Sequence, residues 1–379
     1  MMNINIKQER IHSMDVIRGF AILGIFFVNW PSLTGVEMHD QERAYIGIDA
    51  YIRCFYDLFV QTKFYTIFSF LFGLGFYIFM TRAETITSWP KLLFIRRLLL
   101  LLMFGALHFI LLWRGDILHS YAVTAFLLLM FYKKRPKTVM VWAFMLLMLF
   151  MLFIFVAYSF TPHSSTSSYP APLADWTEQV QERFASFTSE QIAVNLIYIP
   201  ETLGLFLLGL YFGKKDIFRR VKELDGKLKK LQIIAFLLTL PSWYKILSYF
   251  VSTDVYNAAE VFPYVVASGK TLFIFYVLTL LRMMEREKWQ RLLRPFQYVG
   301  RMALTNYLLQ TIATVLIFNI CFKNSAALPL YAGIPFCLVF YMLQIWGSRL
   351  WLSHFSYGPM EYIWRLGTYG RLKQEKSPG

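Results

Sequence analysis

The chain has 379 residues, of which 57% are hydrophobic and 16% are charged, and its formal net charge is +15. Soluble domains average roughly 45–50% apolar and about 25% charged residues, so this composition excludes an ordinary soluble protein. The three cysteines, Cys54, Cys321 and Cys337, form no CxxC pair, which excludes a disulfide scaffold and a zinc site. The basic residues lie in short segments between apolar runs, so the positive charge does not indicate nucleic-acid binding.

Apolar runs long enough to cross a hydrocarbon core of roughly 30 Å recur along the chain. They predict an all-α, polytopic membrane helix bundle of about ten transmembrane helices, in one domain over residues 1–379. The first run begins with Asp15 and Arg18 and has no cleavage site after it, so we expect it to stay as a helix. The predicted spans cover about 15–33, 62–81, 92–112, 115–132, 138–160, 192–213, 231–251, 264–282, 300–321 and 329–352.

Lysine and arginine residues between the spans gather in alternate connections. The richest of these connections lie at 133–137, 214–230 and 286–294, whereas the connections between them are poor in cations. Because basic loops stay in the cytoplasm, this pattern and an even number of spans predict that both termini are cytoplasmic. The same pattern predicts an outer loop with an amphipathic segment at 162–190 and a cytoplasmic tail with an amphipathic helix at 353–379.

A polar island, HFILLWRGDILHSY from His108 to Tyr121, lies between two apolar runs and is predicted to be a tight turn at the outer face. Ionisable groups at membrane depth are costly, so they indicate a functional site. Asp116 is placed to orient His108 as an acid–base pair, although a satisfied buried histidine and a helix-capping aspartate are the structural alternatives. His119 is expected to be solvated at the rim, and Arg114 to reach the interface.

Two spans repeat one spacing. Arg18 and Asn29, and likewise Arg97 and His108, are eleven residues apart, so each pair shares a helix face over about 16 Å. The two faces predict a polar track from inner arginines, which suit phosphate groups, to the outer side. Further candidates for binding a substrate or acyl-CoA are Lys63, Arg301, Asn306 and Gln310.

Each of these residues also has a plain structural interpretation. Asp15 and Arg18 fit a local ion pair at the membrane surface, and Asn29 fits a hydrogen bond between helices. Asn306 and Gln310 lie four residues apart and fit packing between helices equally well. No metal-ligand spacing, phosphate-binding glycine loop or nucleophile elbow occurs, so no metal and no resident cofactor is predicted.

Seven features along the chain occur together: DVIRGFAILGI followed by Asn29, KFYTIFSFLFG from Lys63, the pair Arg96 and Arg97, His108, WRGDIL followed by Tyr121, VGRMALTNYLLQ from Val299 and GPMEYIWRLGTY from Gly358. Together they resemble the YeiB-type family of bacterial inner-membrane proteins. The resemblance covers nearly the whole chain and implies a multi-pass protein of the bacterial cytoplasmic (inner) membrane. The activity of that family is unassigned, and it is described only as transport-associated.

The start of the chain is more remotely similar to the transmembrane acyltransferase superfamily that includes heparan-alpha-glucosaminide acetyltransferase. The similarity lies in DxxRGxA from Asp15 and in Asn29. That superfamily passes acyl groups from cytoplasmic acyl-CoA to an acceptor across the membrane. An essential histidine of that relative lies in the first outer loop, where His39 is the local candidate; only Asn29 is carried over as a catalytic residue.

Three hypotheses follow. The first is an acyltransferase in which Arg18, Arg97 and Arg301 hold an acyl-CoA co-substrate, and His108 with Asp116 acts as base toward an envelope acceptor. The second is a transporter or transport-associated protein that uses the same polar path. The third is a non-catalytic membrane scaffold. In all three the lipid bilayer is the partner, and the acceptor and the oligomeric state stay open.

Overall fold

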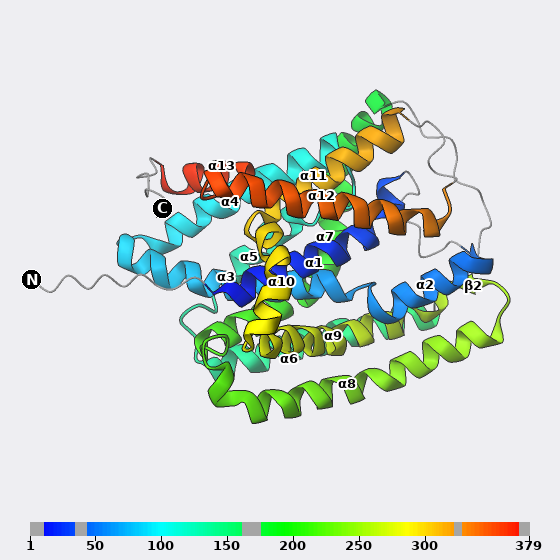
Figure 1. Cartoon of the computed structure of the whole chain (residues 1–379), viewed down its shortest axis with the longest axis horizontal. Helices are drawn as coiled ribbons and strands as arrows, with labels where there is room; N and C mark the ends of the chain where they lie inside the picture. Colours follow the sequence, from blue (N-terminus) through cyan, green and yellow to red (C-terminus); the bar gives the residue numbers. More distant parts are fainter. Residues whose placement is uncertain (1–10, 35–43, 161–175, 322–327, 371–379) are drawn as a thin grey trace, which may run out of the picture.

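The computed structural model describes residues 11–34, 44–160, 176–321 and 328–370, which form a bundle of helices and one minimal pair of strands. Most of the long helices run along one common direction (Figure 1). The first helix begins at the end of the bundle where the last helix lies (Figure 1). The predicted all-α helical bundle is therefore confirmed.

Eight helices of the described chain are long and apolar enough to cross a membrane. Their backbone groups are hydrogen-bonded within each helix, which a hydrocarbon environment requires. They are α1 (His12–Leu33), α2 continued by α3 (Gly47–Phe59 and Lys63–Ile86), α4 (Pro90–Leu111), α6 (Pro136–Phe160), the second half of α7 (Trp176–Lys214), α8 (Val221–Ser252), α9 (Ala258–Met283) and α12 (Gly333–His354).

Burial divides these helices into central and peripheral ones. The most apolar window of α1 is 61% buried, whereas those of α6 and α8 are 22% and 17% buried. The outward side chains of the two peripheral helices are apolar, among them Phe144 of α6 and Leu238 of α8, so they suit contact with lipid tails. The chain is an integral, multi-pass membrane protein.

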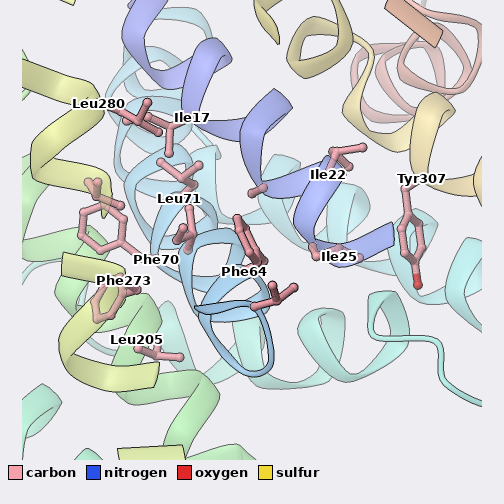
Figure 2. Close-up of a cluster of buried hydrophobic side chains, with 14 of the residues drawn as sticks. Ile17, Ile22, Ile25, Phe64, Phe70, Leu71, Leu205, Phe273, Leu280 and Tyr307 are labelled. Carbon is pink, nitrogen blue, oxygen red and sulfur yellow. The ribbon is translucent and has the colours of Figure 1, made fainter. Parts of the chain in front are cut away.

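The core lies where α1, α3 and α9 meet. Ile17, Leu71 and Phe273 are buried in one apolar cluster that these helices share. Tyr307 of α11 (Ala303–Val315) lies on the side of α1 opposite to Phe273 (Figure 2). The buried cluster therefore extends around α1, from Phe273 of α9 on one side to Tyr307 of α11 on the other.

Close helix contact explains part of this arrangement. A Cβ atom on Gly19 of α1 would lie 1.9 Å from the carbonyl oxygen of Phe296, and one on Gly300 would lie 1.8 Å from that of Asp15. Both contacts join α1 to α10 (Glu287–Arg301). Only glycine lets the two backbones approach so closely, as the small residues in the first span indicate.

Two of the ten predicted spans differ from the structure. The span predicted at 115–132 contains α5 (Leu118–Leu128), whose 11 residues rise only about 16 Å. The span predicted at 300–321 is α11 with a π-helical end (Leu316–Cys321), and α11 meets α10 at an angle of 75°. Tight turns on both sides shorten α5, and the break at Met302 bends the chain.

The two strands and α2 were not predicted, whereas the two amphipathic segments were. The first outer connection contains α2 and a strand, β1 (Ala44–Tyr45), which pairs antiparallel with β2 (Tyr256–Asn257). The amphipathic segment that begins at Trp176 is continuous with the following span, so α7 is one helix of 39 residues. After α12, the tail forms α13 (Pro359–Tyr369) within the stretch where an amphipathic helix was predicted, and α13 packs against α4.

Candidate functional site

The turn between α4 and α5 brings two histidines onto one carboxylate. Asp116 accepts a hydrogen bond from His108 Nδ1 through one oxygen and from His119 Nδ1 through the other, each over 2.9 Å. It also accepts one from the backbone N–H of His119 at 3.0 Å, which caps the first turn of α5. All three side chains are buried, so both roles predicted for Asp116, cap and orienter, coexist in the geometry.

The sequence prediction for His119 was wrong. We expected a solvated histidine at the membrane rim, but the side chain is only 2% exposed. Phe109 of α4 and Phe187 of α7 pack edge-on against its ring, with centroids 5.6 and 5.8 Å away. Arg114 is partly exposed and lies 3.5 Å from Glu182, so it does sit near the surface.

Glycine and arginine hold the turn in place. A Cβ atom on Gly105 would lie 2.3 Å from the backbone nitrogen of His119 and 2.9 Å from Asp116 Oδ2, so the turn rests directly on α4. Arg183 of α7 donates to the carbonyls of Ile110 and Leu111, which end α4. The first half of α7 thereby covers the histidine turn from one side.

A cavity of about 280 Å³ lies between α1, α3, α4, α5, α11 and α13. Its volume falls just below the roughly 300–1,000 Å³ of typical ligand pockets, so it suits a narrow arm of a ligand better than a whole nucleotide. Most of the wall is aliphatic or aromatic. Its polar and charged lining residues are Arg18, Arg97, Tyr121, Arg301, Tyr307, Tyr357, Glu361, Trp364 and Arg365.

The charged residues of the cavity gather at one end. Arg97 stacks on the ring of Trp364 at 3.5 Å, and Trp364 Nε1 donates to the carbonyl of Arg97 at 2.9 Å, which fixes α13 on α4. Arg365 lies 4.2 Å from the centroid of the Tyr357 ring. Four arginines and one glutamate line the cavity, so this end attracts anions.

Glu361 has a structural task at the same place. One of its oxygens accepts from the backbone N–H groups of Leu304 and Thr305 at 2.7 and 3.1 Å, and the other from Thr305 Oγ1 at 2.6 Å. These bonds cap the first turn of α11 just after the break. Burial raises the pKa of the Glu361 carboxyl above its usual value, although the hydrogen bonds oppose this shift.

The other end of the cavity reaches the histidine turn. Ile117, Leu118 and Tyr307 line it there. The ring of Tyr307 contacts that of His108, with centroids 5.3 Å apart. The cavity therefore joins three arginines predicted from the sequence, Arg18, Arg97 and Arg301, to the residue that packs on His108.

Four other predicted site residues lie elsewhere. Lys63 donates to the carbonyls of Asp57 and Val265 and to Ser268, so its ammonium group holds the end of α2 against α9. Asn29 is half-buried near the end of α1 and does not line the cavity.

Asn306 and Gln310 join α11 to α12. Asn306 donates to Ser348 at 3.0 Å, and Gln310 donates to Gln344 at 2.9 Å. This is the packing role that the sequence also allowed. His39 falls outside the described residues.

A second buried polar cluster was missed. Glu201 of α7 pairs with Lys270 of α9 and accepts a hydrogen bond from Tyr65 of α3. Charges inside the spans predicted at 192–213 and 264–282 were the available signal. Among the described residues, no group of three potential ligands able to hold a metal ion occurs.

The C-terminal half of the chain matches a known family. Residues 212–371 match the family described as "Protein of unknown function (DUF418)". These residues include α10 to α13, and hence Arg301, Tyr307 and Glu361 of the cavity.

Full-length relatives are bacterial. The chain is 32% identical to the "Uncharacterized 39.9 kDa protein in amylase 3'region" of Bacillus acidopullulyticus, over 96% of this chain and 95% of the relative. It is 30% identical to YxaH of Bacillus subtilis, over 96% of this chain and 95% of that protein. It is 28% identical to YeiB of Escherichia coli, over 95% of this chain and 96% of that protein.

Proposed function

The chain belongs to the YeiB-type family of bacterial membrane proteins, and for this member we propose an acyltransferase that moves an acyl group from cytoplasmic acyl-CoA to an acceptor at the outer face. The observation that carries the proposal is the cavity between the arginine end and Tyr307, which packs on His108. A scaffold would have no need of a cavity that leads from a cationic mouth to the ring packed on an oriented histidine.

The shape and charge of the cavity suit an acyl-CoA thioester. Guanidinium groups at the mouth bind phosphates bidentately, so the nucleotide end of the donor stays outside with Arg18, Arg97 and Arg301. The apolar wall accepts the thin pantetheine arm and the acyl group. The thioester then lies toward Tyr307 and the histidine turn.

His108 supplies the base. Asp116 accepts a hydrogen bond from Nδ1–H, which keeps that proton on Nδ1 and leaves the Nε2 lone pair to take a proton from an acceptor hydroxyl or amine. The acceptor atom attacks the thioester carbonyl, the carbon–sulfur bond breaks, and the imidazolium returns its proton to the departing thiolate. The products are the acylated acceptor and free CoA, and no redox partner is needed.

The test uses the full chain in lipid nanodiscs with radiolabelled acetyl-CoA or longer acyl-CoA and bacterial envelope lipids and glycans. We expect label to move to an envelope component, and His108→Ala to lower the rate by about 10²- to 10⁴-fold. His354→Ala is the matched control, because His354 is an exposed histidine at the end of α12. Full activity in His108→Ala would remove the role of His108, and absence of transfer with every donor would refute the proposal.

Transport is the second candidate, favoured by the helix break at Met302 and the buried Glu201–Lys270 pair. Discontinuous helices and intramembrane ion pairs occur along transport paths. Uptake or efflux by proteoliposomes without an acyl donor, lost in Glu201→Gln, would favour transport over acyl transfer.

A further inference from the structure

We propose that the two imidazoles of the histidine turn hold different protonation states, His119 being the imidazolium and His108 the neutral base. Asp116 lies between them and serves both. His119 is then a positioning residue, because it keeps His108 neutral. The use of His108 as a base rests on the proposed function. The assignment itself follows from the hydrogen bonds of the described residues.

The Nδ1 atoms of both His108 and His119 carry a proton. A carboxylate only accepts hydrogen bonds, and each Nδ1 lies 2.9 Å from an oxygen of Asp116, so both Nδ1 atoms carry a proton. A neutral imidazole with Nδ1–H has a bare Nε2, whereas an imidazolium carries a second proton there. The protonation state of each ring is therefore decided at Nε2.

The partners of the two Nε2 atoms differ. His119 Nε2 lies 3.2 Å from Ser120 Oγ, whose own proton goes to Asn195 Oδ1, so the hydroxyl oxygen offers a lone pair to an Nε2–H donor. His108 Nε2 is buried and has no hydrogen-bond partner among the residues that the structure describes. A proton at His108 Nε2 would be an unsatisfied buried donor, whereas a proton at His119 Nε2 is accepted.

Charge balance points the same way. The rings that face the two histidines are those of Phe109, Trp113, Phe187 and Tyr307. Arg183 of α7 donates its guanidinium N–H groups to the carbonyls that end α4. Arg114 is turned outward to Glu182. An imidazolium at His119 neutralises the carboxylate within hydrogen-bond distance, which a buried charge requires.

The imidazolium has a consequence for His108. The positive charge of the His119 imidazolium neutralises the Asp116 carboxylate, so the carboxylate no longer favours a second positive charge on His108. If His119 were neutral, the uncompensated carboxylate would favour a proton on His108, and the Nε2 lone pair that acts as base would be lost. His119 thus acts through Asp116, without touching the substrate.

The test is ¹⁵N NMR of the full chain, labelled at its six histidines and held in lipid nanodiscs at pH 7 without any acyl donor. Imidazolium, Nδ1–H and Nε2–H forms give distinct ¹⁵N signals, and each ring is assigned in the unmodified chain by through-bond correlation to its own backbone signals. We expect an imidazolium at His119 and the Nδ1–H form at His108. An imidazolium at His108, or a neutral His119, in the unmodified protein would overturn the proposal.

Two variants sharpen the test. Ser120→Ala removes the acceptor and should make His119 neutral, whereas Ser120→Thr keeps the hydroxyl and should leave the imidazolium signal unchanged. His119→Gln should convert His108 to the imidazolium and lower acyl transfer at pH 7 by about 100-fold. Equal signals in Ser120→Ala and Ser120→Thr would refute the role of the hydroxyl. The NMR result does not depend on acyl transfer, so a failed transfer assay with the expected signals would count against the proposed function alone.

Discussion

Glu361 places one buried carboxylate among the arginines of the cavity, and its protonation is linked to stability. Because burial raises its pKa, the folded protein holds a proton at pH values where the unfolded chain has released it. The contribution of Glu361 to stability is therefore fully present below pH 4.5 and is lost as pH rises from 4.5 through the raised value. We expect thermal unfolding in detergent, followed by tryptophan fluorescence, to move to lower temperature over this window.

A glutamine removes the titration without removing the cap. In Glu361→Gln the side-chain oxygen still accepts from the N–H groups of Leu304 and Thr305, so the pH dependence should flatten in this window. Glu287→Gln serves as the control, because Glu287 is exposed at the start of α10. A pH profile that is the same in Glu361→Gln and the unmodified chain would contradict the prediction.

At the residue level, the sequence predicted interactions between residues that are close together along the chain. Asp116 and His108 lie eight residues apart across a glycine turn, and that spacing was enough to predict their pairing. The burial of His119 depends on Phe187, which lies far along the chain, so no local pattern contained it. The packing of α13 over Arg97 could not be predicted from the sequence either, because it joins segments more than 260 residues apart.

Between elements, Gly105 sets the distance from α4 to the histidine turn. In Gly105→Ala the new methyl group would meet the backbone of His119 at 2.3 Å, and the turn would have to move. We expect a loss of about 1–3 kcal/mol in stability, the usual cost of overpacking. Under the proposed function, acyl transfer should fall as well, because the contact between Asp116 and His108 depends on the same turn.

Gly347→Ala provides the matched control. Gly347 lies within α12 and has open space where a Cβ would be, so alanine should be neutral or stabilise the helix by roughly 0.5–1 kcal/mol. Thermal unfolding of both variants, together with the transfer assay, checks the comparison. Equal stability of the two variants would show that the turn adapts to the methyl group.

Hydropathy located most of the spans but not their interruptions. Hydropathy is averaged over a window of about 20 residues, so a short helix with its flanking turns has the same average as one full span. This average therefore predicted one span around α5 and gave no sign of the bend at Met302. The helices α2 and α10 carry polar and charged residues within connections, where an apolar pattern gives no signal. Their positions depend on contacts with α9 and α1, which are set by the tertiary fold.

For the whole molecule, the segments predicted to be cytoplasmic from their positive charge lie together at one end of the helix bundle. The start of α1, the start of α8 and α13 lie at one end of the bundle, and the turn between α8 and α9 lies at the other (Figure 1). Residues 214–230, which end α7 and begin α8, form the segment richest in lysine and arginine, whereas residues 253–257 contain none. The arginine end of the cavity, held by α13, therefore lies on the side predicted to be cytoplasmic.

Reporter fusions test this orientation in bacterial cells. Green fluorescent protein, which fluoresces in the cytoplasm, is fused after Tyr369 or inserted after Lys215, and alkaline phosphatase, which is active outside, is inserted after Asp254. We expect all three reporters to be active, because α8 has 32 residues and rises about 48 Å, more than the roughly 30 Å of the hydrocarbon core. Exchanging the reporters should silence them. An active phosphatase after Tyr369 would place the arginine end of the cavity outside, where cytoplasmic acyl-CoA cannot reach it, and would remove the proposed donor.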